Sequence, residues 1–161
     1  MKNVLTLTLA ATFMATLTGC ASSQTATSST AKETKTYKVA VVKQLDHASL
    51  DEIAKAICDE FDAISEKEGV KIEYGDVYSG QNDQTVLQQI ASQVTSEGVD
   101  AIVPVATLAA QTMTVASDGT VPVVFAAISD PEAANLTGID YVTGTSDALN
   151  TKQIMEMMLK A

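Results

Sequence analysis

Three polar residues stand where an apolar stretch gives way to a turn or a helix: Thr107, Asp130 and Asp147. Thr107 begins the helical pattern of VATLAAQTM, and its hydroxyl together with the unpaired N–H groups of a first helical turn can bind an anion without arginine. The two aspartates offer carboxylates to an ammonium group. Local roles are the alternatives: Thr107 as a helix N-cap, and each aspartate as an ordinary turn residue.

The other reactive side chains offer little catalytic chemistry. His47 is the single histidine, which excludes a multi-histidine metal site, and we expect neither a metal nor another cofactor. Cys58 lies within an apolar stripe of helical spacing and is interpreted as a buried structural thiol rather than a nucleophile. The chain contains no G-x-S-x-G motif, and one histidine would have to serve any triad. We therefore expect that the protein is not an enzyme.

The charge balance restricts the partners. Twenty acidic residues stand against ten lysines, and arginine is absent. Phosphate contacts rely on lysine and arginine, so we expect no nucleic-acid partner. A bound carboxylate or phosphate would have to be held by backbone N–H groups, hydroxyls or lysine.

The N-terminal region has the pattern of an export signal followed by a tether. Residues 1–19 combine a short positive start with an apolar run too short to span a bilayer, which predicts a signal peptide. The run ends in Leu17-Thr18-Gly19-Cys20, which resembles the lipobox of bacterial lipoproteins. We therefore expect Cys20 to be lipidated and residues 20–36 to form a flexible Ser/Thr-rich linker. The alternative is an ordinary signal peptide with a chance cysteine. The expected location is the extracytoplasmic face of the cell membrane.

Residues 37–161 alternate between apolar runs and amphipathic stretches, which predicts an α/β fold with a parallel sheet covered on both faces. Strand-to-helix loops then share one edge of the sheet, where ligands bind. No dinucleotide or phosphate-binding glycine motif occurs. The expected strands are 38–42, 70–74, 100–106 and 121–127; the expected helices are 46–68, 82–97, 107–117 and 150–161; the expected edge loops are 43–48, 78–82, 106–109, 128–133 and 143–147.

The last expected helix is followed by no strand, although a βαβ progression should deliver one. From this pattern we expect residues 37–161 to be an incomplete domain. Ile154, Met157 and Met158 lie together on that helix and are expected to belong to a core.

Four segments in order resemble the ABC transporter substrate-binding lipoproteins of the tryptophan/tyrosine type: KVAVVKQLDHASLDE, DAIVPVATLAAQTM, VPVVFAAISDPEAANL and VTGTSD. The resemblance implies a three-layer, doubly wound parallel sheet, namely the N-terminal lobe of the type I periplasmic-binding-protein fold, with the second lobe largely missing. Two positions depart from the pattern: Leu108 stands where proline is common, and Asp46 where glutamate is common. Carried over by position, the residues facing the cleft are Gln44, His47, Thr107, Ala109, Asp130 and Asp147.

The function that the resemblance implies is solute uptake. We expect a lipid-anchored binding component of an ABC importer that binds a small solute, such as an aromatic amino acid, and works with a permease and an ATPase subunit. Two other classes stay open on the sequence: a secreted α/β enzyme such as an acyl hydrolase, and a ligand-sensing receptor domain.

Overall fold

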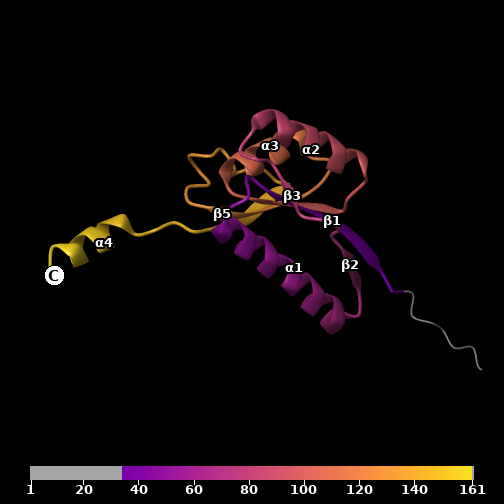
Figure 1. Ribbon diagram of the computed structural model, residues 1–161, viewed down its shortest axis with the longest axis horizontal. Coiled ribbons are helices and arrows are strands. Elements are labelled where there is room, and N and C mark those ends of the chain that lie inside the picture. Colours follow the sequence, from indigo (N-terminus) through magenta and orange to yellow (C-terminus); the bar gives the residue numbers. More distant parts are fainter. Residues whose placement is uncertain (1–33, 161) are drawn as a thin grey trace, which may run out of the picture. The chain divides into compact units, whose positions relative to one another are not determined.

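The computed structural model describes residues 34–160 (Figure 1). Within them, six parallel strands form one sheet in the order β2-β1-β4-β5-β6, with β3 also pairing with β1. The expected signal peptide, Cys20 and most of the expected linker lie outside the described residues. The strands are β1 (Thr36–Lys43), β2 (Lys71–Glu73), β3 (Tyr78–Ser79), β4 (Ala101–Val105), β5 (Val123–Ile128) and β6 (Val142–Ser146). The helices are α1 (Ala48–Glu68), α2 (Gln84–Ser96), α3 (Thr107–Ser117) and α4 (Thr151–Met158).

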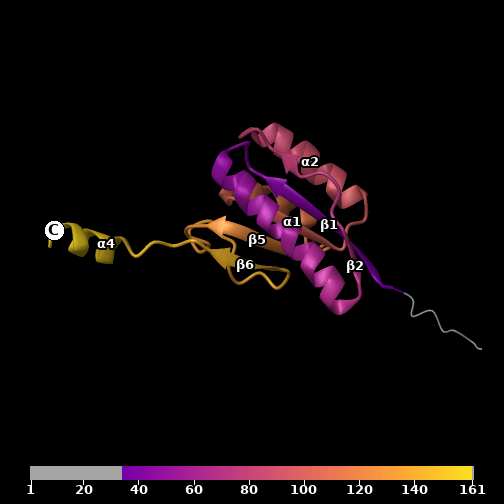
Figure 2. The same ribbon diagram turned by 60° about the horizontal axis from the view of Figure 1, so that its bottom comes forward.

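Helices cover the sheet from both sides, with α1 on one face and α2 and α3 on the other (Figure 2). Alternate side chains of β1 divide accordingly. Val41 packs with Ala54 of α1, whereas Ala40 and Val42 pack with Leu87 of α2 and its neighbours. Because successive strand residues point to opposite faces, a continuous apolar run is what a doubly covered strand requires. The predicted three-layer α/β fold is confirmed.

Two stretches expected as loops are strands. Tyr78–Ser79 forms β3 beside β1, and Val142–Ser146 forms the edge strand β6. The β6 sequence VTGTS is polar because an edge strand that is largely exposed has little apolar surface to bury. Its Gly144 is required by packing, since a Cβ atom there would overlap the carbonyl oxygen and the ring of Phe125.

The apolar residues of α4 also differ from expectation. Ile154, Met157 and Met158 are exposed rather than buried, so they do not extend the core among the described residues. Within residues 34–160, no helix combines the length and the apolar character needed to cross a bilayer.

Helix α2 begins at a strong N-cap. The carboxylate of Asp83 accepts hydrogen bonds from the N–H groups of Thr85 at 2.7 Å and Val86 at 3.1 Å. These bonds stabilise the charged form and hold the pKa of Asp83 below its usual value. The cap fixes where α2 starts, and hence the loop that precedes it at the sheet edge.

The Asp83 cap predicts a pH dependence. A carboxylate whose pKa is lower in the folded chain contributes stability that is present above its unfolded pKa and is lost as the pH falls through the folded value. Asp83→Asn keeps a capping oxygen but cannot titrate. The excess unfolding free energy of the wild type over this variant should therefore be constant above about pH 5 and shrink below about pH 4. Urea unfolding across this range measures it; an excess that stays constant down to pH 3 would contradict the assignment.

Candidate functional site

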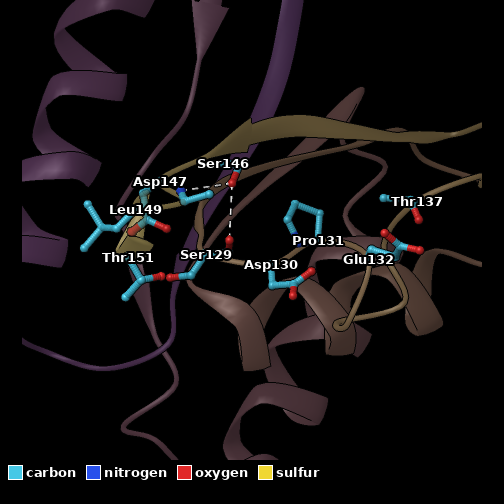
Figure 3. Close-up of a pocket in the computed structure, with 10 residues that line it drawn as sticks. Ser129, Asp130, Pro131, Glu132, Thr137, Ser146, Asp147, Leu149 and Thr151 are labelled. Carbon is cyan, nitrogen blue, oxygen red and sulfur yellow. Dashed lines mark hydrogen bonds between the residues drawn. The ribbon is translucent and has the colours of Figure 1, made fainter. Parts of the chain in front are cut away.

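A surface pocket of about 870 Å³ opens at the carboxyl ends of β5 and β6 (Figure 3). It lies between the segment after β5 and the segment after β6. The hydroxyl of Ser146 links the two segments through a hydrogen bond to the Ser129 carbonyl and another from the Ala148 N–H. The lining residues are Ser129, Asp130, Pro131, Glu132, Thr137, Ser146, Asp147, Ala148, Leu149 and Thr151.

Asp130 and Asp147 both line this pocket, although they lie 17 positions apart in the sequence. Oδ1 of Asp130 accepts a hydrogen bond from the Ala133 N–H at 2.9 Å, so this residue is also the turn residue of the alternative interpretation. The structure pairs Asp147 with no other side chain within residues 34–160. Both residues are exposed. Each therefore offers at least one carboxylate oxygen to a bound cation.

The start of α3 lies at the same edge of the sheet as this pocket, because β4 and β5 are neighbouring strands and the Ala106 N–H donates to the Ala126 carbonyl at 3.0 Å. No residue of α3 lines the pocket itself. The N-cap position belongs to Ala106, which has no capping side chain. Thr107 is therefore the first residue of the helix and not its N-cap, and it is exposed. Ala109 is fully buried in the core beneath this turn and does not lie at the surface of the edge.

Gln44 contacts this turn from the loop that follows β1. Its Oε1 accepts a hydrogen bond from the Leu108 N–H at 2.9 Å, and its Nε2 donates to Oδ1 of Asn82 at 2.8 Å. His47 lies further along the same loop, where its Nδ1 accepts from the Ser49 N–H and caps α1. The side chains of Gln44 and His47 therefore already have hydrogen-bond partners within the chain in the absence of a solute.

An ion-pair cluster fixes the base of the same loop. The half-buried ammonium of Lys43 contacts the carboxylates of Asp46, at 2.9 Å, and of Asp51. Hydrogen bonds to Asp51 and then Asp46 raise the pKa of Lys43, and the bond to Lys43 is the largest cause that lowers the pKa of Asp46. Sequence reasoning missed this cluster, although the spacing of Lys43, Asp46 and Asp51 around a helix start was a usable signal.

Several residues at this edge of the sheet have strained backbone conformations. Gln81, Asn82, Ala106 and Ala127 all have positive φ, and Ala106 combines φ 76° with ψ 162°, a region that only glycine enters without a steric cost. Such strain persists only where the surrounding structure enforces it, and it is frequent at ligand-binding sites. No pattern in the amino-acid sequence indicates this strain directly.

The strain at Ala106 predicts a stabilising substitution. Ala106→Gly should raise the unfolding free energy by about 1 kcal/mol, because relief of 1–3 kcal/mol of strain exceeds the entropic cost of glycine. Ala110→Gly is the matched control inside α3 and should lower stability by about 1 kcal/mol or more. Urea unfolding of the three proteins measures both. A loss of stability in both variants would contradict the strain at Ala106.

Other chemistry is sparse in residues 34–160. No group of three or more His, Cys, Asp or Glu side chains is arranged to hold a metal ion. Cys58 is half-buried on α1, and burial, followed by the charges of Asp62 and Asp59, raises the pKa of its thiol. A thiol with a raised pKa is a poor nucleophile at neutral pH.

The sequence profile described as "ABC transporter substrate binding protein" matches residues 38–161. The chain belongs to this family. The family consists of substrate-binding proteins and not of enzymes, and such proteins are extracytoplasmic. Both statements agree with the sequence-based expectations, and the membership excludes the acyl-hydrolase alternative.

Solved structures agree with the family match. The chain is 33% identical to an ABC domain from Streptococcus pneumonia in complex with L-Trp, with a TM-score of 0.65. It is 31% identical to a conserved domain protein from Vibrio cholerae (TM-score 0.67) and 28% identical to a ligand-free, open substrate-binding protein with adhesive properties from Clostridium difficile (TM-score 0.57). Each match covers 77% of this chain and 43% of the other. No curated protein matches the chain significantly.

The edge of this substrate-binding protein can therefore present two kinds of group to a solute. Donors come from the first turn of α3, where Thr107 is an exposed residue and the helix dipole adds positive potential. Acceptors come from Asp130 and Asp147 in the adjacent pocket. This arrangement suits a small molecule that carries both a carboxylate and an ammonium group.

Proposed function

We propose that the chain is the solute-binding part of a lipid-anchored component of an ABC importer, and that its solute is an amino acid, with tryptophan or tyrosine favoured. The observation that carries the proposal is the pocket lined by Asp130 and Asp147, which opens at the same edge of the sheet as the start of α3. The L-Trp complex of the pneumococcal relative supports the choice of an aromatic amino acid. Its protein partners are a permease and an ATPase subunit.

The chemistry of the chain supports this choice of solute. Without arginine, the carboxylate of an amino acid is bound by the hydroxyl and the N–H of Thr107 at the positive end of α3. The ammonium group is bound by Asp130 and Asp147. Pro131 and Leu149 contribute the apolar surface of the pocket. The lipid anchor is Cys20, and the chain contacts the membrane through that anchor.

Calorimetric titration with three related ligands tests the proposal. L-Tryptophan carries both groups, indole-3-propionate lacks the ammonium, and tryptamine lacks the carboxylate. L-Tryptophan should bind at least about tenfold more tightly than either analogue, since each lost charge-assisted hydrogen bond weakens binding by about that factor or more. Equal affinity for all three ligands, or no binding of any of them, would contradict the proposed solute.

A further inference from the structure

The side chain of Gln44 connects three segments that are distant in the sequence. It extends from the end of β1, accepts a hydrogen bond from the first turn of α3 through Leu108, and donates one to Asn82 in the loop between β3 and α2. These partners lie 64 and 38 positions away. Gln44 is half-buried, and the N–H of Asn82 returns to the Gln44 carbonyl at 2.8 Å.

The orientation of the Gln44 amide follows from its partners. An N–H group must meet an oxygen, so the Leu108 N–H fixes Oε1 toward α3 and Nε2 toward Asn82. The backbone N–H of Gln44 also donates to the Val105 carbonyl at 3.1 Å. Every polar group of Gln44 therefore has a protein partner before any solute arrives.

We propose that Gln44 is a positioning residue that fixes the first turn of α3, and that it does not touch the solute. The proposal rests on the proposed function, and it differs from the cleft contact implied by the family resemblance. By bonding Leu108, Gln44 withdraws one N–H group from the solute and leaves Thr107 as the exposed donor of that turn. Asn82, held at φ 56°, is the anchor that keeps the Gln44 amide in place.

The first test needs no solute. Gln44→Met keeps the length of the side chain and removes both hydrogen bonds. In the free protein, the Leu108 amide proton should exchange with solvent about three- to tenfold faster than in the wild type, as expected for the loss of one net hydrogen bond. Exchange at Val94, in the buried face of α2, is the internal control and should not change. An unchanged Leu108 exchange rate would overturn the proposal.

The second test separates positioning from contact. Gln44→Met should weaken L-tryptophan binding about three- to tenfold. Asn82→Gly, which tolerates the positive φ, should weaken it similarly, and the double variant should lose no more than Gln44→Met alone. Asn82→Asp retains an oxygen acceptor and should bind like the wild type. If Gln44→Met weakens binding while Asn82→Gly leaves it intact, Gln44 contacts the solute and the proposal is wrong.

The two tests fail independently of the proposed function. If the wild type does not bind L-tryptophan, the proposed solute is wrong, yet amide exchange at Leu108 still decides whether Gln44 fixes the start of α3. If the wild type binds and the exchange rate does not respond to Gln44→Met, the positioning role is wrong and the proposed solute stands.

Discussion

Asp130→Asn and Asp147→Asn should each weaken the binding of L-tryptophan about ten- to a hundredfold, because each removes one charge-assisted hydrogen bond to the ammonium group. Binding of indole-3-propionate, which has no ammonium group, should change little or improve. Asparagine at position 130 retains the oxygen that accepts the Ala133 N–H, so the turn is preserved while the charge is removed. The measurement is a calorimetric titration of each variant with both ligands.

Asp140→Asn is the matched control for these variants. Asp140 is exposed and precedes β6, at the opposite end of that strand from Asp147. The same charge is removed far from the pocket, so the affinity should stay within about twofold of the wild type, as expected of a surface charge without a direct contact. If both pocket variants retain wild-type affinity and wild-type preference, the two aspartates are only turn residues.

The second large effect concerns Cys20. The chain expressed in a bacterium that processes lipoproteins should partition into the detergent phase, and Cys20→Ser should move it almost completely to the aqueous phase, because this residue is the proposed attachment site of the acyl anchor. Residues 34–160 contain no spanning helix that would hold the chain in the bilayer instead. Phase partitioning followed by immunodetection measures the distribution.

Cys58→Ser is the internal control, since it removes the other cysteine and leaves the anchor site intact. It should stay in the detergent phase. If Cys20→Ser stays in the detergent phase, something other than an acyl group on Cys20 holds the chain there, and the prediction is wrong. If Cys58→Ser leaves the detergent phase, Cys58 rather than Cys20 carries the anchor.

The sequence predicted the layers of the fold because periodicity reports burial. The continuous apolar runs of β1 and β4 require a cover on both faces, and the apolar stripes of α1 and α2 require a surface to pack against. A sheet with helices on both faces meets both requirements. The sequence did not predict strands β3 and β6, because neither shows a periodic pattern of burial. Tyr78–Ser79 is too short to show a period, and the exposed edge strand β6 has a polar sequence.

The candidate site was only partly predictable. Topology placed Asp130 and Asp147 at one edge, because the carboxyl ends of neighbouring parallel strands lie there. The bonds from Gln44 to Leu108 and Asn82 depend on the register of three segments, and the positive φ of Ala106 depends on how α3 follows β4. Local sequence patterns carry no information on either.

The family resemblance and the structure contribute differently to the site. The resemblance placed Gln44, His47 and Ala109 in the cleft by position alone. The structure gives these residues other partners: Gln44 bonds two segments, His47 caps α1, and Ala109 lies in the core. Contact of His47 and Ala109 with a solute stays a prediction, whereas Gln44 is proposed to make none. Thr107, Asp130 and Asp147 are exposed at the edge.

The measurement that tests the central claim most directly is a nuclear magnetic resonance titration of the ¹⁵N-labelled chain with L-tryptophan. The amide signals of Thr107, Asp130 and Asp147 should shift together and saturate at a common affinity, because one solute contacts both the start of α3 and the pocket. Residues of the separate cavity near Lys38 and Tyr78 should not respond. Shifts confined to that cavity, or saturation at Asp130 and Asp147 with no response at Thr107, would contradict the account.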